Sequence, residues 1–406
     1  MADASGQLHM ETHADLLKGG KSGPALVKGR SADSLLVKRL EGTILPKMPM
    51  QGALPAEQIA LVKAWIDGGA AEGTTPASSG MASAPLAAGP ATLPAIAPRR
   101  SVPAPVDALA FNPDGTRLAV AGYKEVRIVD VARGTVATWR GPLALVRAVA
   151  WSPDGRFLAA AGGLPLQSGE VVVFDAATGE RVRAWTGHTD AINAVAFSPD
   201  GSLLASGSHD KLAKLWDPAT GREVRTLKEH TEAVFPVAFS PDGTWLATGG
   251  GDRTVKIWDV LSGRRLYTLS DPLDAVYALA FHPSGKRIAA GGADKMIRLF
   301  ELTAEGGTMV QALVAHDDAV LALAFARDGQ TLWSAGADRL VKRWDLASGR
   351  ETAVLEAQPD WPQSIAVSPD GREVAVGRLD GSAALYATDT RQKRLEPRVA
   401  DHPSKP

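Results

Sequence analysis

The sequence predicts an all-β fold, a seven-bladed β-propeller preceded by a small all-α region and a linker. The main observation is a repeat in which an apolar residue is followed by Pro-Asp-Gly or a near match. The repeat is anchored, at spacings of 40 to 46 residues, on Phe111, Trp151, Phe197, Phe239, Phe281, Phe325 and Val367. Each unit also holds alternating apolar runs, such as INAVAF and LAKLWD, which are typical of short strands joined by tight turns. Three or four such strands make one antiparallel sheet, and seven sheets in radial array make a propeller.

The region from Met1 to about Ala70 is predicted to be helical. One helix is expected within residues 31–42, with Ser31 as its cap and Gly42 just after its end. A second is expected from Pro55 to Gly68, with an apolar stripe made of Ile59, Val62 and Ile66 and with Trp65 at its flank. Two short helices form only a small core.

Residues 71–97 contain almost only Ala, Pro, Ser, Gly and Thr, which predicts a flexible or partly extended linker. The propeller is expected over residues 98–390 and a C-terminal tail over residues 391–406. The outer strand of the seventh blade could come from Leu93–Ala97 or from Arg391–Val399. We favour the N-terminal segment, because it would join the first and last blades and leave no free edge.

Charge and composition exclude several classes of function. The chain has 44 basic and 45 acidic residues, so it offers no basic surface for nucleic acid or an anionic membrane. It has no cysteine, which excludes disulfides, thiolate metal sites and cysteine nucleophiles but does not determine the compartment. Residues 1–30 contain no apolar stretch of signal-peptide length, and no segment of the sequence reaches the apolar length of a spanning helix.

Several units share further residues in register. The dipeptides Trp216-Asp217, Trp258-Asp259 and Trp344-Asp345 end the third run of their units, and Gly187-His188 precedes one of them. The units resemble WD repeats over the whole of residues 98–390. The resemblance implies a non-catalytic, monomeric platform for protein partners.

Four polar or aromatic residue types recur at constant distances from the anchors of three repeats. The three sets are His188, Ser206, Asp210 and Trp216; His230, Thr248, Asp252 and Trp258; and His316, Ser334, Asp338 and Trp344. Each set lies within one repeat, so the histidines cannot converge on one metal ion. In WD repeats these positions resemble a hydrogen-bonded tetrad that ties the strands of a blade together, and four such groups can satisfy one another when buried. The fifth and seventh units lack most of the set but keep Asp294 and Asp380.

The WD resemblance also implies where partners bind. In similar propellers, residues four and six positions before each anchor face the narrow opening. The fourth-before set is Asp107, Arg147, Asn193, Phe235, Tyr277, Leu321 and Gln363, and the sixth-before set is Pro105, Leu145, Ala191, Ala233, Ala275, Ala319 and Trp361. Four of these residues would make an apolar crescent typical of interface anchors: Phe235, Tyr277, Leu321 and Trp361. The alternative is that some of them only pack into the sheet.

The N-terminal region is similar to the C-terminal part of a planctomycete-type cytochrome c-like domain. The order of LLKGGKSGPALVKGRSADSLLVKRLEG, the Met48-Pro49 element and LPAEQIALVKAWIDGGA carries this similarity. The resemblance implies that Met48, or else Met50, corresponds to an axial haem ligand. The family's C-x-x-C-H motif is absent, and His9 and His13 are poor substitutes.

Two explanations remain: a misplaced start that removes the haem-attachment segment, which we favour, or a relic domain without haem. No haem is therefore expected in this chain, whereas a full-length form would carry haem c, transfer electrons and be periplasmic or exported. Without such a form the expected location is the cytoplasm. The rival reading is a propeller oxidoreductase with a haem c domain and a cofactor in the propeller channel. Against it, Asp107 and Arg147 are the only charged members of the fourth-before set.

Overall fold

The computed structural model describes residues 17, 25–44, 54–70, 104–141 and 144–397. The chain divides into two compact units, residues 1–96 and 97–406, and each is considered by itself. None of the helices in these described ranges has the length and apolar character that crossing a membrane requires. Met48, Met50, His9, His13 and the expected linker lie outside the described residues.

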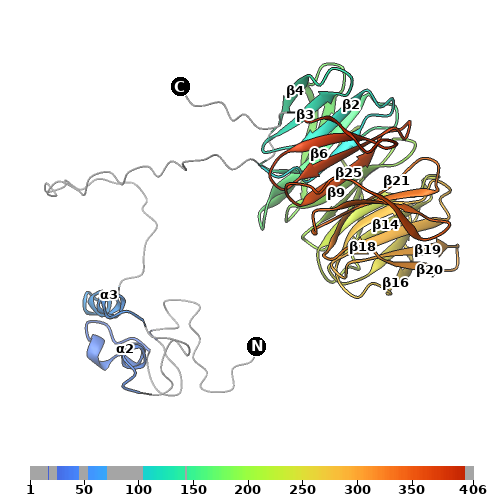
Figure 1. Cartoon of the computed structure of the whole chain (residues 1–406). Coiled ribbons are helices and arrows are strands. Elements are labelled where there is room, and N and C mark those ends of the chain that lie inside the picture. Colours follow the sequence, from blue (N-terminus) through green and yellow to red (C-terminus); the bar gives the residue numbers. More distant parts are fainter. Residues whose placement is uncertain (1–16, 18–24, 45–53, 71–103, 142–143, 398–406) are drawn as a thin grey trace. The chain divides into compact units, whose positions relative to one another are not determined.

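The described part of the N-terminal unit contains a short 3-10 helix, η1 (Ser31–Asp33), and two α-helices, α2 (Leu35–Leu40) and α3 (Ala56–Asp67) (Figure 1). Its core consists of Leu26, Val37 and Ile66, which are buried against one another. Gly42 follows α2 with a positive φ of 74°, the left-handed conformation expected after a helix end.

The expected cap at Ser31 is wrong. Ser31 begins the 3-10 turn, and its backbone N and Oγ lie 2.7 Å and 2.8 Å from the carboxylate of Asp67, which ends α3. Ser34 is the residue that precedes α2, and Pro55 precedes α3 instead of starting it. Ser31 therefore connects η1 to the end of α3. This is a long-range contact that a local capping pattern does not reveal.

The second unit is a seven-bladed propeller, as predicted, and each blade is a four-stranded antiparallel sheet. Blade one contains β1 (Leu109–Phe111), β2 (Arg117–Ala121), β3 (Glu125–Asp130) and β4 (Val136–Arg140). Blade two contains β5 (Val146–Trp151), β6 (Phe157–Leu164), β7 (Ser168–Asp175) and β8 (Arg181–His188). Blade three contains β9 (Ile192–Phe197), β10 (Leu204–Ser208), β11 (Ala213–Trp216) and β12 (Glu223–Leu227). Blade four contains β13 (Val234–Phe239), β14 (Trp245–Gly250), β15 (Val255–Asp259) and β16 (Arg265–Leu269).

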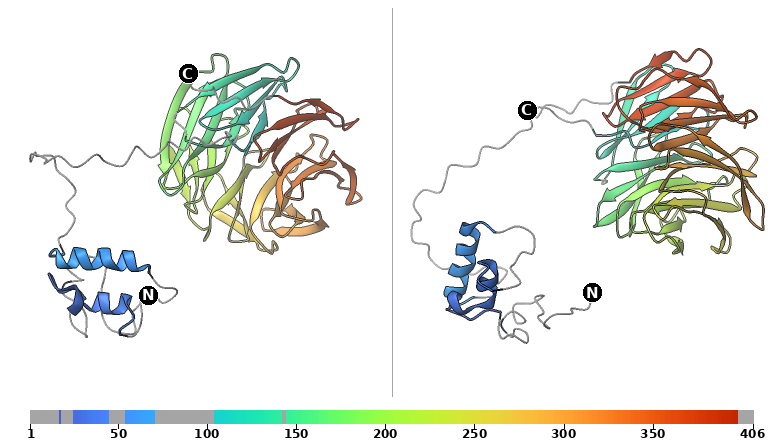
Figure 2. Two further views of the ribbon diagram at one scale, coloured as in Figure 1. Left: turned by 60° about the vertical axis from the view of Figure 1, so that its left-hand side comes forward. Right: turned by 60° about the horizontal axis from the view of Figure 1, so that its bottom comes forward.

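The remaining blades repeat this order. Blade five contains β17 (Val276–Phe281), β18 (Arg287–Gly292), β19 (Met296–Leu302) and β20 (Gly307–Val314). Blade six contains β21 (Val320–Phe325), β22 (Thr331–Gly336), β23 (Val341–Asp345) and β24 (Arg350–Val354). Blade seven contains β25 (Pro362–Val367), β26 (Glu373–Arg378), β27 (Ala383–Ala387) and β28 (Lys393–Leu395). Figure 2 shows the blades arranged around a central axis.

Each repeat anchor is the last residue of the first strand of its blade, and the turn that follows explains the recurring Pro-Asp-Gly. In blade three, Asp200 Oδ1 accepts hydrogen bonds from Ser198 Oγ at 2.5 Å and from the Ser202 backbone N at 3.0 Å. Gly201 has a φ of 73°, which a residue without Cβ adopts at no steric cost. The aspartate satisfies the turn, and the glycine allows the chain to reverse.

The first strands lie side by side around the whole ring, and β1 lies beside β25 where the ring closes. The expected N-terminal closing strand is wrong. The outer strand of blade seven is β28, from the C-terminal alternative, and residues 93–97 lie outside the described residues. The outer strand of blade seven is therefore the strand that follows β27 directly in the chain. Closure instead relies on Val106, whose N donates to Arg378 O at 2.9 Å and whose O accepts from Ser364 Oγ at 3.0 Å.

Candidate functional site

The fourth-before residues share a backbone feature that the repeat offset does not explain. In six blades the pairing of the first and second strands shifts at this position, which creates a β-bulge. The residues at the bulges are Arg147, Asn193, Phe235, Tyr277, Leu321 and Gln363. A bulged residue leaves the regular alternation, so its side chain is turned away from the pleated face. We call these six residues, together with Asp107, which precedes β1, the inner ring.

The polar half of the inner ring is connected by hydrogen bonds across blades two, three and four. Arg147 Nη1 donates to Asn193 Oδ1 at 3.2 Å and lies 3.3 Å from His209 Nε2. Asn193 Nδ2 donates to the Val234 carbonyl of blade four at 2.9 Å. Arg147 Nε is buried without a hydrogen-bond partner among the described residues. The guanidinium is thus held in place at one end and keeps a donor unused.

The aromatic half continues from the same histidine. The ring of His209 lies 5.7 Å from that of Phe235, perpendicular to it, and Phe235 lies 5.2 Å from Tyr277 at 76°. Edge-to-face pairs of this kind are favourable beyond the area that they bury. Burial lowers the pKa of His209, and Arg147 lowers it further, so the imidazole is neutral and can accept from the guanidinium. Arg147, His209, Phe235 and Tyr277 form a continuous row over four blades.

The rest of the expected crescent is not joined to this row. Leu321 and Gln363 occupy the same bulge positions in blades six and seven and are half-buried. Trp361 is 45% exposed and has no ring contact with any residue that the structure describes. The aromatic contact is therefore limited to Phe235 and Tyr277.

The sixth-before residues have a backbone role instead of presenting side chains. In six blades the carbonyl of this residue accepts a hydrogen bond from the backbone N twelve positions after the anchor, for example His209 N to Ala191 O at 3.1 Å and Leu379 N to Trp361 O at 2.9 Å. Ala191 is fully buried, so the expectation that its side chain faces a partner is wrong. The backbone at this position therefore holds a loop in place. Trp361 shares this backbone role but differs in having a large, exposed side chain.

Asp107 is a carboxyl group at the inner ring with an unusual pKa. Burial raises the pKa of Asp107 to about 6, although the Arg147 guanidinium opposes the shift. A carboxyl group that is buried at a cost to stability, beside a fixed cation, is a candidate for function.

We expect Asp107→Asn to stabilise the protein at high pH. The raised pKa means that the favourable contribution of this group is present below pH 4 and is lost as pH rises through about 6. The free energy of unfolding of the variant relative to the parent should therefore be about 2 kcal/mol higher at pH 8 than at pH 4. Denaturant titrations at both pH values measure this difference.

Asp114→Asn is the matched control for this experiment. The hydrogen bonds that Thr116 donates to Asp114 lower the pKa of this carboxyl group, so the control should lose stability at high pH. Equal differences for Asp107→Asn at the two pH values would contradict the assignment.

The three predicted tetrads are brought together in the structure. The histidine Nδ1 lies 2.9 Å from the carboxylate in His188–Asp210, His230–Asp252 and His316–Asp338. The Nε2 lies 2.7 to 2.8 Å from the hydroxyl of Ser206, Thr248 or Ser334. The same hydroxyls accept from the indole N–H of Trp216, Trp258 and Trp344 at 2.8 to 2.9 Å. The histidine side chains are fully buried.

The expectation that each tetrad lies within one blade is wrong. His188 is the last residue of β8 in blade two, whereas Ser206 and Trp216 belong to blade three. His230 and His316 likewise lie in the connection from the outer strand of the preceding blade. The tetrads therefore tie this connection to the next blade.

Blades five and seven replace the tetrad with arginine networks that sequence reasoning missed. In blade five, Arg298 Nη1 lies 2.5 Å from Asp294 Oδ2, and both side chains are buried. In blade seven, Arg378 is 1% exposed and donates to Gln358, Ser382, Glu396 and Tyr386. The sequence does mark Arg378 as unusual. At the equivalent positions, blades three to six carry only small residues, namely Ser208, Gly250, Gly292 and Gly336.

His209 was also missed, and its signal is of the same kind. The equivalent residues of blades four to six are small, namely Gly251, Ala293 and Ala337. A large polar residue at a position where the following repeats carry small residues indicates a role that is specific to its own blade. In the part of the chain that the structure describes, no three His, Asp or Glu side chains gather as a metal-binding group.

Comparison with known families matches the family described as "WD domain, G-beta repeat" (WD40). The matched segments are residues 134–175, 179–217, 221–259, 263–301 and 307–345. No curated protein matches the chain. Each matched segment runs from the outer strand of one blade to the third strand of the next. The sequence repeat is offset by one strand from the blade, which explains why a tetrad within one repeat joins two blades.

Proposed function

Because WD40 repeats form the seven-bladed propeller of this chain, we propose that the protein is a non-catalytic interaction scaffold that binds a protein partner at its inner ring. WD-repeat propellers commonly serve as such scaffolds. The observation that carries the assignment to this surface is the continuous row of Arg147, His209, Phe235 and Tyr277.

The composition of the row supports protein recognition. Arginine and tyrosine are among the residues that contribute most to protein interfaces, and they do so when they are held rigidly in a partly desolvated setting. Asn193 and His209 hold Arg147 in this way, and Phe235 and Tyr277 hold each other. The carboxyl group of Asp107 supplies an acceptor for polar groups of a bound segment.

The non-catalytic assignment rests on how the polar residues are used. The histidines of the three tetrads are fully buried and bonded to an aspartate and a hydroxyl, so no substrate reaches them. The alternative remains an oxidoreductase with a haem c domain and a cofactor in the propeller channel. An absorption band or a bound organic cofactor in the purified protein would favour that alternative.

We expect the double variant Phe235→Ser, Tyr277→Ser to lose at least about tenfold in partner capture, the effect of removing one interface hot spot. Both rings contribute apolar area at the inner ring and support each other. The loss is measured by quantitative pull-down with the full chain, in which isotope labelling compares the amounts of protein captured by the parent and by the double variant.

Leu261→Ser is the control, because Leu261 is 84% exposed on the turn between β15 and β16. Thermal unfolding of all variants distinguishes lost binding from lost folding. Unchanged capture of every interactor by a folded double variant contradicts the proposal. Trp361→Ser, tested separately, shows whether the exposed tryptophan takes part.

For the N-terminal unit we propose a relationship to cytochrome c-like domains, based on the order of its sequence elements. The chain has no cysteine, so it does not fit the covalent attachment of a c-type haem. Ile66 of α3 is fully buried against Leu26 and Val37. We propose that this chain binds no haem covalently and is a monomer, with the cytoplasm as the alternative to a periplasmic or exported location.

Haem c, electron transfer and a periplasmic location belong to this proposal only for a form of the protein that carries C-x-x-C-H. Sequencing the DNA upstream of Met1 in frame tests for that motif. The absorption spectrum of the protein expressed from the longer reading frame then tests for haem.

A further inference from the structure

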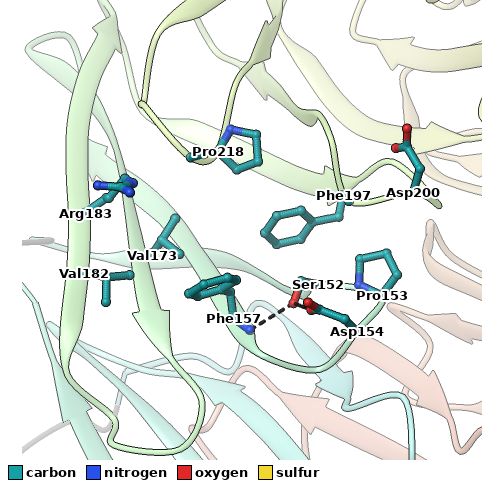
Figure 3. Close-up of a pocket in the computed structure, with 12 residues that line it drawn as sticks. Ser152, Pro153, Asp154, Phe157, Val173, Val182, Arg183, Phe197, Asp200 and Pro218 are labelled. Carbon is teal, nitrogen blue, oxygen red and sulfur yellow. Dashed lines mark hydrogen bonds between the residues drawn. The ribbon is translucent and has the colours of Figure 1, made fainter.

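A pocket of about 610 Å³ lies between blades two and three, away from the inner ring. Its walls are mainly apolar and come from strands and turns of both blades (Figure 3). Phe157 and Val173 belong to blade two, whereas Phe197 and Pro218 belong to blade three. The related pockets between blades four and five and between blades one and two are smaller, about 410 Å³ and 280 Å³.

Two other interfaces, between blades three and four and between blades four and five, are bridged by a long side chain, which we call the closing residue, that hydrogen-bonds to the next blade. In blade three, Arg225 Nη2 donates to the Leu261 carbonyl in the turn between the third and fourth strands of blade four. In blade four, the Tyr267 hydroxyl donates in the same way to the Thr303 carbonyl of blade five at 3.0 Å. Each closing residue pairs across its sheet with a core residue of the third strand, Leu215 or Ile257.

Arg183 is the equivalent residue of blade two, because it pairs with Val173. The equivalent turn residue of blade three is Ala219, which lines the pocket together with Arg183. The Arg183 guanidinium nevertheless makes no hydrogen bond or ion pair with any described residue. The arginine that would close this interface is exposed, and the pocket remains open.

The two ends of the pocket differ in charge. In Figure 3, Arg183 lies at one end, and Asp154 and Asp200 lie at the other. Hydrogen bonds from Ser152 lower the pKa of Asp154, and hydrogen bonds from Ser198 and Ser202 lower that of Asp200, so both carboxylates are ionised. The pocket therefore has a cationic end without a partner, an apolar middle and an anionic end.

We propose that this pocket is a second docking site, which binds a segment of a partner protein carrying an acidic side chain next to a bulky apolar one. The acidic group pairs with Arg183, and the apolar side chain fills the space between Phe157 and Phe197. A basic or amide donor of the segment faces Asp154 and Asp200. This charge order selects the orientation of the segment, and it does not depend on the inner ring.

The test uses the full chain with methyl-labelled valine and the probe acetyl-Asp-Phe-Lys-amide. We expect saturable shifts of the Val173 and Val182 methyl signals in NMR spectra at probe concentrations up to about 10 mM, the range for a minimal ligand. Arg183→Gln should weaken binding about two- to fivefold, as expected for an exposed ion pair. Arg181→Gln, on the same strand but outside the pocket lining, should leave the affinity unchanged.

A second variant keeps the proposal testable if the effect of the charge is small. Val182 is 44% exposed, so Val182→Trp should fill the pocket without affecting the core and should abolish the shifts of the Val173 methyl signals. Equal affinity for acetyl-Asn-Phe-Lys-amide or acetyl-Asp-Ala-Lys-amide would overturn the proposed recognition. Absence of shifts, or shifts that arise from protein concentration alone and so indicate a second copy, would also overturn it. The Phe235→Ser, Tyr277→Ser protein should bind the probe normally, which separates this result from the inner-ring proposal.

Discussion

Replacing Arg378 with methionine is expected to lower the free energy of unfolding by about 3 to 5 kcal/mol, the range for breaking a buried charged network from one side. Arg378 Nε donates to Gln358 Oε1 at 2.9 Å and Nη2 donates to the Tyr386 hydroxyl at 2.9 Å. Nη1 donates to Ser382 Oγ at 2.9 Å and lies 3.2 Å from Glu396 Oε1. The variant would leave Gln358 and the Tyr386 hydroxyl buried with fewer partners, which costs more than the lost bonds alone.

The position of Arg378 adds to this effect. Its backbone carbonyl accepts from Val106 of the first blade, and its side chain reaches Glu396 just after β28. The residue thus lies where the first and last blades meet and where the outer strand of blade seven is held. Methionine is a flexible apolar side chain of similar length, so most of the loss should come from the polar network.

Denaturant titration at neutral pH measures this effect, and Arg372→Met is the matched control. Arg372 belongs to the same blade, but its side chain is 86% exposed and its ion pair with Asp370 is 3.9 Å long. The control should change stability by less than about 0.5 kcal/mol. A loss below about 1 kcal/mol for Arg378→Met would show that the network does not support ring closure.

Replacing Asp252 with alanine is expected to destabilise the protein by about 2 to 4 kcal/mol, the range for a buried hydrogen-bond network. Asp252 accepts from Thr231 N at 3.1 Å and from Thr254 Oγ1 at 2.7 Å, and it lies 2.9 Å from His230 Nδ1. Its loss leaves the buried imidazole of His230 with only the Thr248 hydroxyl, and it releases the connection between blades three and four. Thermal and denaturant unfolding measure the effect.

The pH dependence of the Asp252 variant gives a second check. Burial alone would raise the pKa of Asp252, but hydrogen bonds from His230 and Thr254 hold it well below its ordinary value. A lowered pKa means that the stabilisation is complete above the ordinary pKa and is lost as pH falls through the folded value. The difference between parent and variant should therefore shrink in acid. Asp271→Ala, at an exposed aspartate, is the control, and an unchanged melting temperature for Asp252→Ala would refute the tetrad's role.

Much of the architecture was predictable because it is encoded locally. The anchor residues end their first strands, the Asp-Gly turns follow them, and the alternation of apolar residues selects the buried face, all within about ten residues. The tetrads were also predictable, because His, Ser or Thr, Asp and Trp recur at constant offsets. The resemblance to WD repeats pointed to the bulged positions of the inner ring, although it did not reveal the bulge itself.

Interactions made by residues that the repeat does not share were not predictable from it. Arg378 and His209 are the only polar side chains of their size at their positions in the repeat, so no recurring pattern pointed to their partners. The repeat also did not indicate that Arg183 makes no bond across its interface, whereas Arg225 and Tyr267 hydrogen-bond to the next blade from equivalent positions. The outer strand of blade seven depended on which terminus pairs with β27, and both candidates had suitable length.

The sequence by itself determined that this protein is a seven-bladed propeller, because strand length, turn chemistry and buried face are local properties repeated in register. Only the tertiary structure decided that β28 completes the ring, that the tetrads join neighbouring blades, and that Arg147, His209, Phe235 and Tyr277 form one row. The row depends on side chains from different blades, such as Arg147 and His209, which are 62 residues apart in the chain and meet only after the blades have packed. A repeat describes each blade, whereas the contacts between unlike blades set the surfaces on which a partner can bind.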